Sequence, residues 1–495
     1  MSAAAPSHDD RAWFGHPRGL ATLYFTELWE RFSYYGMRAL LMLFLVATPE
    51  AGGLGLSTPR AGLIYGTYTM SVYLLTIVGG FIGDRFLGAR HSVRLAAYLI
   101  AAGHFTLALD SRASFAVGLV LVAVGSGLLK PNMSTMVGAL YSPDDPRRDA
   151  GFSLFYMGIN VGALLGPLAT GFLAQSGAWK GLIASFGFNP ATSWHWGFAA
   201  AGVGMVLGIL WLRSTEHRIA HVGNAPDADT PRPWRTLAAV VAGSAALIAY
   251  VSWADRPGWE WLRSVFVIAP VVGAIGLALR RDSAAKRAAV VLVFFLAAML
   301  FWGVYEQGGS TLSLFANELT RHTLFGWEFP SAWYQAVGSL FVILLAPLFA
   351  WGWPRLGRRQ PSSPFKLALG LAFLAASFAL MIPAAKLTAT GLVSPWWLAG
   401  LFFLQTIGEL CLSPVGLSAM TRLAPAKWAG VVMGVWFLAD ALGSKLAGVL
   451  AGEFTANDPA RLARLFETQA LVLACGALAL LALVPTLKRL MSGVR

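Results

Sequence analysis

Long apolar stretches separated by short polar segments run through nearly the whole chain. Most of these stretches approach the roughly 20 residues that an α-helix needs to cross the hydrocarbon core of a bilayer. The pattern therefore predicts an all-α, polytopic membrane protein with fourteen transmembrane helices. The predicted spans are residues 20–46, 59–82, 93–110, 114–139, 150–174, 195–213, 236–254, 264–279, 288–308, 332–351, 366–385, 396–419, 429–452 and 468–487.

Two polar segments divide the spans into groups. Residues 214–235 are polar and contain three prolines, and residues 280–287 are a basic run. They bracket the seventh and eighth spans, which carry no embedded charge apart from Asp255 and Arg256 at their turn. The resulting order of six, two and six spans resembles the two parallel halves of major facilitator transporters with an inserted hairpin. The predicted parts are an N-terminal tail 1–19, a six-helix bundle 20–213, a linker with two extra helices 214–287, a six-helix bundle 288–487 and a C-terminal tail 488–495.

The distribution of basic residues predicts the orientation. Of the 37 Lys and Arg residues, most lie in segments that face the cytoplasm if the N-terminus does, and few lie in the opposite segments. Because basic loops stay on the cytoplasmic side, we predict that both termini are cytoplasmic. The net charge of +13 is explained by this topology, so we expect the lipid bilayer, and no nucleic acid, as a partner.

The first predicted span contains charged residues at helical spacing. Glu27 and Glu30 are three residues apart, and Glu27 and Arg31 are four apart, so all three lie on one helix face. Tyr34, Tyr35 and Arg38 continue that face. Charges in hydrocarbon are costly and normally face a bundle interior or a water-filled path. This helix thus predicts a cavity that suits a charged ligand and protons.

Ionisable residues in the other spans follow a pattern. Lys130 lies in the fourth span, Glu306 in the ninth and Glu409 in the twelfth. Without the inserted pair, these spans and the first are core helices 1, 4, 7 and 10, which line the central cavity in the major facilitator layout. The cavity then contains four glutamates and three basic residues, Arg31, Arg38 and Lys130. In a low dielectric, the carboxylate in excess should bind a proton. Our hypothesis is that this acid couples transport to protons.

Local motifs in both halves point to one family. The motifs are Glu27-x-x-Glu30-Arg31-Phe-x-Tyr34-Tyr35, Gly79-Gly80-Phe-Ile-Gly-Asp84-Arg85-Phe-Leu-Gly88, Gly125-x-Gly127-Leu-Leu-Lys130-Pro131-Asn132, Phe155-Tyr156-Met-Gly-Ile-Asn160-Val-Gly162, Tyr305-Glu306-Gln307, Gly408-Glu409-Leu-Cys-Leu-Ser413-Pro414 and Trp436-Phe437-Leu438. Together they resemble the proton-dependent oligopeptide transporter family, from about Leu20 to Leu487. The inserted pair of helices is similar to that of the bacterial members, which implies a place in the bacterial inner (plasma) membrane.

The resemblance implies a role for each matching residue in a proton-coupled symporter of di- and tripeptides. Arg31 and Lys130 would bind the peptide carboxylate, and Glu409 with Asn160 would bind its ammonium group. Proton coupling would involve Glu27, Glu30 and Glu306. Further substrate contacts would come from Tyr34, Tyr35, Arg38, Tyr73, Trp302, Gln335 and Trp436. The gating salt bridges would be Arg38 with Glu306 and Lys130 with Glu409.

The chain departs from the family pattern at a few positions. The stretch Gln335-Ala-Val-Gly338-Ser339 lacks the Asn and Pro that the family commonly has after this Gln, and Asp440 and Ser444 stand at two usual Asn positions. Lys445 comes next, five residues after Asp440, so these two residues either pair with each other, reach loop water or take part in transport. Asn160 either contacts ligand or bonds the backbone beside it. Asp84 and Arg85 indicate a structural latch rather than a ligand site.

Other functions agree less well with the residues. A proton-coupled carrier of nitrate or of a drug is the near alternative, but it needs less of the paired acids and bases. A membrane enzyme would need a catalytic group, and the nearest candidate, His104 with Asp110, lacks a supporting partner. A channel is disfavoured because the charges are mixed in sign. We expect no cofactor, with protons as the coupling ion, no metal site and a monomer. Cys411 and Cys475 are interpreted as small core hydrophobic residues with no redox role.

Overall fold

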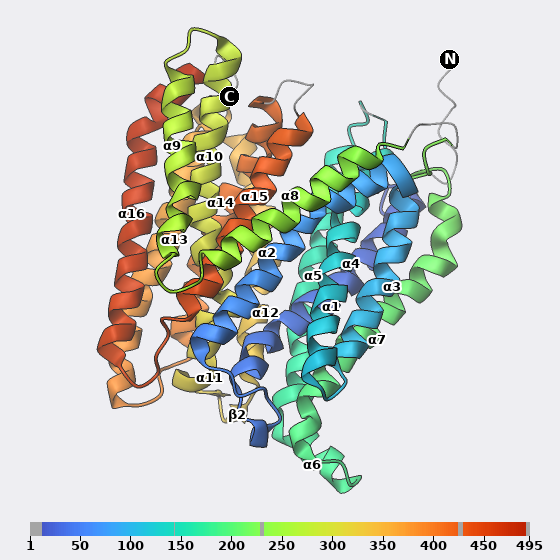
Figure 1. Cartoon of the computed structure of the whole chain (residues 1–495), viewed down its shortest axis with the longest axis vertical. Coiled ribbons are helices and arrows are strands. Elements are labelled where there is room, and N and C mark those ends of the chain that lie inside the picture. Colours follow the sequence, from blue (N-terminus) through green and yellow to red (C-terminus); the bar gives the residue numbers. More distant parts are fainter. Residues whose placement is uncertain (1–11, 143, 228–231, 424–428, 492–495) are drawn as a thin grey trace. The chain divides into compact units, whose positions relative to one another are not determined.

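The computed structural model describes residues 12–142, 144–227, 232–423 and 429–491, and its helices are labelled in Figure 1. The described chain is almost entirely α-helical. Its strands within the described residues form one short hairpin, in which β1 (Thr323–Leu324) pairs antiparallel with β2 (Trp327–Glu328), and two isolated β-bridges lie elsewhere. The prediction of an all-α protein is therefore confirmed.

The chain forms two compact units. The N-terminal unit runs through Leu54 and from Leu74 to Ala245, and the C-terminal unit comprises Gly55–Tyr73 and Ala246–Arg495, so α2 (Thr58–Ile82) and α8 (Trp234–Trp253) contribute to both. The other helices of the N-terminal unit are α1 (Arg18–Val46), α3 (Ala89–Leu107), α4 (Arg112–Ala139), α5 (Arg148–Gln175), α6 (Gly177–Ser185) and α7 (Ser193–Thr215). Those of the C-terminal unit are α9 (Val265–Ala278), α10 (Ser283–Tyr305), α11 (Thr311–Leu319), α12 (Tyr334–Arg355), α13 (Ser363–Leu387), α14 (Trp396–Leu423), α15 (Ala429–Ala451) and α16 (Pro459–Leu490).

Twelve helical segments within the described ranges are long and apolar enough to cross a membrane. Helices α1 and α3 are not among them: α1 contains the predicted charged face, and α3 begins with Arg90 and Arg94. The polytopic character of the chain is thus confirmed. The count of fourteen spans and the orientation of the termini stay predictions, as do the predicted domain boundaries.

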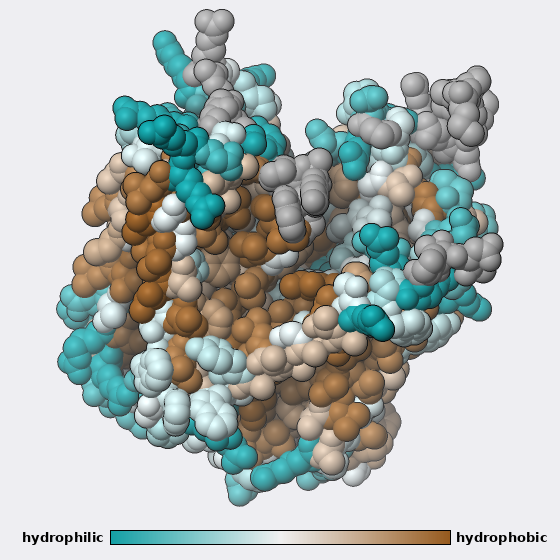
Figure 2. All heavy atoms as spheres, turned by 45° about the horizontal axis from the view of Figure 1, so that its top comes forward, coloured by the Kyte–Doolittle hydropathy of each residue, from teal (hydrophilic) through white to brown (hydrophobic). Residues whose placement is uncertain are grey.

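Apolar side chains cover much of the helix surface seen in Figure 2, and hydrophilic side chains gather toward the helix ends. On α12, Leu340, Leu344 and Leu348 are 42%, 57% and 60% exposed and lie one turn apart. Such a continuous apolar stripe is unusual on a protein in water. It is the surface expected of helices that face lipid.

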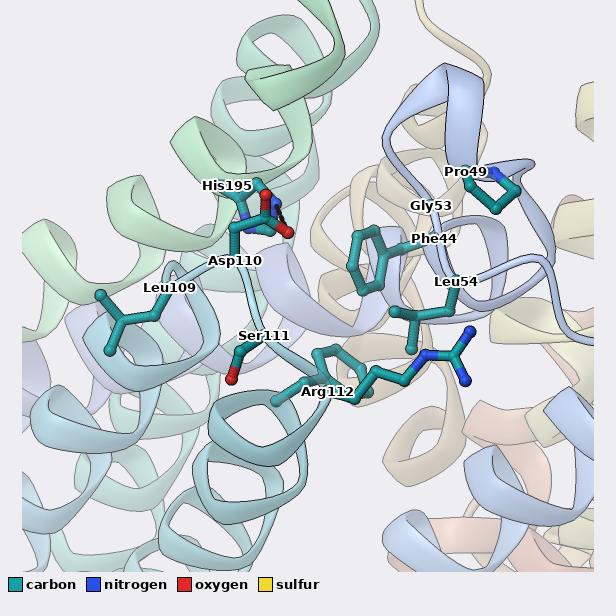
Figure 3. A pocket seen from close by; sticks show the side chains of 10 residues that line it. Phe44, Pro49, Gly53, Leu54, Leu109, Asp110, Ser111, Arg112 and His195 are labelled. Carbon is teal, nitrogen blue, oxygen red and sulfur yellow. Dashed lines mark ion pairs between the residues drawn. The ribbon is translucent and has the colours of Figure 1, made fainter.

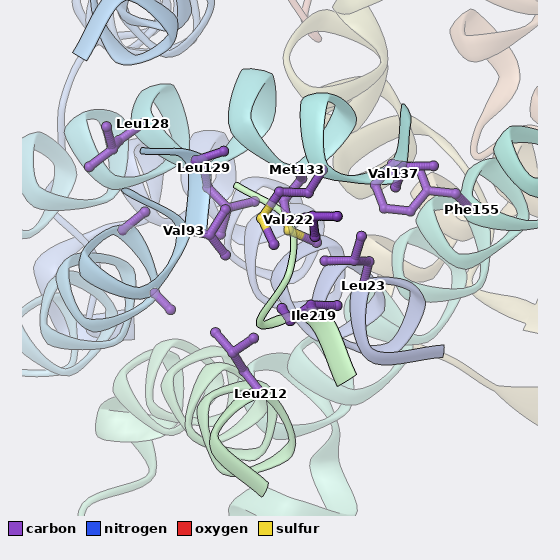
Figure 4. Close-up of a cluster of buried hydrophobic side chains, with 14 of the residues drawn as sticks. Leu23, Val93, Leu128, Leu129, Met133, Val137, Phe155, Leu212, Ile219 and Val222 are labelled. Carbon is purple, nitrogen blue, oxygen red and sulfur yellow. The ribbon is translucent and has the colours of Figure 1, made fainter. Parts of the chain in front are cut away.

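The core of the N-terminal unit joins five helices and the segment after α7. One buried cluster contains Leu23 of α1, Val93 of α3, Leu129 of α4, Phe155 of α5 and Leu212 of α7 (Figure 4). Val222 packs into the same cluster, so the start of the predicted linker 214–235 lies against the bundle. Lipid tails are as apolar as these side chains, so the cluster stabilises the bundle mainly through van der Waals packing.

The basic run 280–287 is partly helical, which differs from the predicted start of the ninth span at residue 288. The Asp282 side chain caps α10 by accepting hydrogen bonds from the N–H groups of Ala284 and Ala285, both at 3.1 Å. These two bonds hold the pKa of Asp282 below its ordinary value. An N-cap of this kind satisfies amide groups that have no partner within the helix, so α10 begins at Ser283.

Candidate functional site

The predicted charged face of α1 forms a buried ion-pair cluster, which we call the α1 cluster: Glu27, Glu30 and Arg31. Arg31 Nε lies 3.0 Å from Glu27 Oε1, and Arg31 Nη2 forms an ion pair with Glu30. All three side chains are more than nine-tenths buried. Ser126 of α4 donates a hydrogen bond of 3.2 Å to Glu30 Oε1. The cluster places two carboxylates against one guanidinium in a site with little water.

Aromatic rings next to the α1 cluster contact its basic neighbours. Lys130 Nζ of α4 lies 4.8 Å from the centre of the Tyr34 ring, and Arg31 Cζ lies 5.4 Å from it. Arg38 Cζ is 5.6 Å from the centre of the Tyr35 ring. The two tyrosines meet edge to face at 5.2 Å. The structure therefore brings Tyr34, Tyr35, Arg38 and Lys130 together with the α1 cluster. The spacing along α1 predicts this for the two tyrosines and Arg38, whereas Lys130 comes from α4.

Glycines of α5 set the position of α1. A Cβ atom at Gly162 would lie 2.3 Å from the carbonyl oxygen of Leu28, and one at Gly166 would lie 2.4 Å from that of Phe32. Such close helix contacts are typical of small residues in membrane bundles. They fix the backbone of α1 on both sides of Arg31, so the charged residues keep a defined place in the unit.

The Gly-rich end of α2 is held against α4. A Cβ atom at Gly79 would lie 2.3 Å from the carbonyl oxygen of Gly127, and Asn132 Nδ2 donates to the carbonyl oxygen of Gly79 at 3.0 Å. This contact lies near Lys130 along α4. The glycine motif that begins at Gly79 therefore serves the packing of α2 against α4.

Asn160 is buried on α5, and its side chain bonds the backbone of its own helix. Its amide Nδ2 donates to the carbonyl oxygen of Tyr156 at 3.0 Å. This agrees with the backbone alternative that the sequence left open. Its contact with a ligand stays a prediction, because the amide oxygen could still accept from an ammonium group.

In the C-terminal unit, Glu409 of α14 is held by a residue of α10. The hydroxyl group of Tyr305 donates a hydrogen bond of 2.6 Å to Glu409 Oε2. Tyr305 also stacks on Phe301 at 5.4 Å and meets Trp302 edge to face at 5.2 Å. The predicted residues Trp302 and Glu409 thus belong to one aromatic and acidic group that Tyr305 joins. The sequence analysis gave Tyr305 no role.

Glu306 lies where α10 stops, which differs from the predicted continuous span 288–308. Residues Glu306–Gly309 form a 3-10 turn, and α11 begins at Thr311. Glu306 is buried at this break. The neighbouring Gln307 donates to Gln469 Oε1 of α16 at 2.9 Å. Interrupted helices with polar groups at the break are a recurrent feature of transporter sites.

The remaining predicted residues of the C-terminal unit lie on three helices, α12, α15 and α2. Gln335 of α12 donates to Ser313 Oγ of α11 at 3.2 Å. Trp436 of α15 is buried, and a Cβ atom at Gly416 of α14 would lie 2.2 Å from its ring. Tyr73 is half-buried on α2. These contacts place the residues structurally but do not test their binding roles.

The two predicted gating pairs combine residues of different units. Arg38 and Lys130 belong to the N-terminal unit, whereas Glu306 and Glu409 belong to the C-terminal unit. Both pairings therefore stay predictions.

Lys445 of α15 has an acidic partner that the sequence analysis did not assign. Its Nζ lies 2.5 Å from Asp255 Oδ2, in the turn after α8. The suggested pairing with Asp440 is therefore not the ion pair that Lys445 makes. Residues five apart on a helix do not face each other, whereas Asp255 reaches Lys445 from another element.

The catalytic group considered for a membrane enzyme does not form. Asp110 lies 3.6 Å from Nε2 of His195 (Figure 3). His104 is fully buried, and neither ring nitrogen has a hydrogen-bond partner among the described residues. The pocket drawn in Figure 3 has a volume of about 300 Å³ and is lined by this ion pair and by apolar residues such as Phe44. It contains none of the predicted substrate residues.

These features define a class of protein: a multi-pass helical membrane transporter with buried acids and bases in both units. Comparison with known proteins gives the family. The family model described as the POT family matches residues 91–466, and the chain belongs to this family. It is a transporter and not an enzyme.

Curated relatives align over most or all of the chain. It is 37% identical to the peptide transporter YePEPT of Yersinia enterocolitica, over 100% of this chain and 99% of that protein. It is 36% identical to a di-/tripeptide transporter of Lactococcus lactis, over 87% of this chain and 88% of that protein. These relatives are bacterial, which agrees with a place in the bacterial inner membrane.

Solved structures agree with the fold. A crystal structure of a mutant peptide transporter POT in complex with alafosfalin has a TM-score of 0.85 and 38% identity, and the match covers 98% of each chain. A POT family transporter in complex with 5-aminolevulinic acid has a TM-score of 0.82 and 30% identity, with 97% of this chain and 98% of that chain covered. The predicted family is thereby confirmed.

Proposed function

We infer that this protein is a proton-coupled symporter that imports di- and tripeptides by alternating access. Membership of the POT family and the peptide transporters among its relatives support this function. The single observation that supports it best is the buried α1 cluster, because two carboxylates that share one guanidinium suit both a charged ligand and a proton.

The roles of the residues follow from the chemistry of a peptide's two ends. A peptide carboxylate suits the guanidinium of Arg31, which can donate two parallel hydrogen bonds, together with the ammonium of Lys130. The peptide ammonium suits a carboxylate, and Glu409 offers one beside Trp302. Binding only the two ends tolerates many side chains, which the aromatic rings of Tyr35 and Trp436 can contact without strict geometry.

Proton coupling is assigned to the α1 cluster because Arg31 already forms ion pairs with glutamates there. Its guanidinium pairs with both Glu27 and Glu30. A proton on either glutamate removes one of these attractions and frees donors of Arg31 for the peptide carboxylate. Protonation and peptide binding would then favour each other, as symport requires.

The topology belongs to this proposal as well. We expect fourteen spans, including the charged α1 and the short α3, with both termini in the cytoplasm and a monomer as the working unit. The pairs Arg38 with Glu306 and Lys130 with Glu409 would form and break as the two units move in the cycle. Antibody access to tags at each terminus in intact and in opened cells tests the orientation.

Uptake into proteoliposomes tests the function itself. Labelled dialanine should accumulate when the proton gradient is directed inward and should only equilibrate without it. Unlabelled dipeptides with different side chains should compete, whereas a dipeptide blocked at both ends should compete poorly. Equal competition by the blocked dipeptide, or driven uptake of nitrate or a drug instead, would identify another substrate class.

Tyr305→Phe should weaken peptide binding without unfolding the protein. The change removes only the hydroxyl group that donates to Glu409, and a hydrogen bond to a charged group contributes enough that we expect the KM for dialanine to rise about ten-fold. Tyr250→Phe is the matched control, because its hydroxyl group donates to the carbonyl oxygen of Leu262 within the inserted hairpin. An unchanged KM in Tyr305→Phe would argue against Glu409 as the ammonium partner.

A further inference from the structure

The inserted hairpin of α8 and α9 reaches α15 through one carboxylate. Asp255, in the turn after α8, lies 2.5 Å from Lys445 Nζ, and its other oxygen lies 3.0 Å from Arg263 Nη2. The side chains of Asp255 and Lys445 are only 9% and 5% exposed. A buried lysine needs a counter-ion, because an unpaired buried charge is strongly destabilising. The hairpin supplies that counter-ion.

Lys445 also contacts the first half of α2. Its Nζ donates to Thr67 Oγ1 at 2.8 Å and approaches the carbonyl oxygen of Leu63 at 3.5 Å. One ammonium group therefore connects three segments: the hairpin, α15 and α2.

The backbones of α2 and α15 touch beside this ammonium group. A Cβ atom at Gly62 would lie 2.3 Å from the carbonyl oxygen of Gly448, and one at Gly66 would lie 2.9 Å from the carbonyl oxygen of Lys445. A contact between glycines has no interlocking side chains, so it can separate without repacking. Only residues 58–73 of α2 belong to the C-terminal unit, and the helix continues into the N-terminal unit from Leu74.

We propose that the inserted hairpin takes part in the transport cycle, because its Asp255 is the counter-ion of a gate formed by the first half of α2 and α15. Alternating access moves the two units against each other, and α2 is one helix with a half in each unit, so we place the separation at the contact between its first half and α15. Lys445 then leaves Thr67 but keeps Asp255, which stays with α15 when the first half of α2 moves away. The gate can thus open without leaving an unpaired buried charge.

This inference rests on the alternating-access cycle of the proposed function, and its test measures distances rather than transport. Nitroxide labels at Arg60 and Asn457, both exposed, report the separation of α2 from the end of α15 by pulsed electron resonance. Cys411 and Cys475 are first replaced by alanine. If the distances change as expected but dialanine is not taken up, the proposed function is wrong and the inference about the hairpin stands.

Two single variants should shift the protein toward the separated state, and a double variant should reverse part of the shift. In Asp255→Asn the closed state holds a buried unpaired lysine, which water can reach when the gate separates, so the ratio of separated to closed molecules should rise at least about ten-fold. Thr67→Val removes one hydrogen bond to a charged group and should raise that ratio by about the same factor or less. The double variant Asp255→Asn with Lys445→Met should lie closer to the wild type than Asp255→Asn alone, because no unpaired charge remains.

Thr69→Val is the matched control on α2, because its hydroxyl group bonds the carbonyl oxygen of Tyr65 in the same helix at 2.9 Å. It should leave the distances unchanged. The proposal fails if Asp255→Asn behaves like this control in folded protein. It also fails if only Thr67→Val shifts the ratio of separated to closed molecules. A double variant Asp255→Asn with Lys445→Met whose ratio equals that of Asp255→Asn alone would contradict it as well.

Discussion

Arg31→Ala should abolish the gradient-driven accumulation of dialanine in proteoliposomes. The variant removes the proposed partner of the peptide carboxylate and leaves Glu27 and Glu30 together in a buried site without their guanidinium. Loss of one partner from a buried ion pair is severe, so we expect uptake to fall at least about 100-fold. Initial rates of labelled dialanine uptake under an inward proton gradient measure the effect.

Two further variants separate charge from geometry at this position. Arg31→Lys keeps the charge but loses the planar fork that binds two carboxylate oxygens, so it should recover only a small part of the activity. Arg461→Ala removes a guanidinium from an exposed ion pair with Glu453 at 2.9 Å and should have almost no effect. Near-normal driven uptake by folded Arg31→Ala would show that the carboxylate site lies elsewhere.

Glu27→Gln and Glu30→Gln should each separate proton coupling from peptide movement. Glutamine keeps the shape of glutamate but cannot change its charge, so neither variant should concentrate dialanine in response to a proton gradient. Exchange of labelled for unlabelled dialanine should persist, because exchange requires only that the loaded protein changes state. Paired measurements of driven uptake and of exchange in the same proteoliposomes test this expectation.

The comparison with Glu409 and with a surface acid makes this result specific. Glu409→Gln should lose both activities, since its carboxylate is assigned to the peptide ammonium, whereas the exposed Glu453→Gln should lose neither. If Glu27→Gln and Glu30→Gln still concentrate peptide, coupling resides in another acid, and Glu306 and Asp440 become the candidates.

The part of the site that the sequence predicts is the part that one helix defines. Glu27 and Arg31 are four residues apart, and helix geometry alone brings their side chains together, as the 3.0 Å contact confirms. Tyr34 follows on the same face for the same reason. The series of long apolar stretches likewise predicted the all-α fold. A stretch that crosses the bilayer must satisfy its backbone hydrogen bonds within itself, and an α-helix does so.

Contacts between helices could not be obtained in this way. Ser126 donates to Glu30, and Tyr305 donates to Glu409, but each partner lies about 100 residues away along the chain. Lys445 had a nearby acid in the sequence, and spacing alone could not show that Asp255 would be closer in space. The break at Glu306 was also missed, because an apolar window does not show where a helix loses its hydrogen bonds.

The glycine contacts between α1 and α5 have a consequence for changing the substrate range by directed evolution. No side chain at Gly162 or Gly166 can fit without pushing α1 away from α5, and that displacement would carry Arg31 with it. Libraries selected for new peptides should therefore recover glycine at both positions whatever the selected peptide is. Useful diversity should instead come from positions such as Tyr35 and Trp302, where a change of side chain alters the wall of the site and leaves its frame in place.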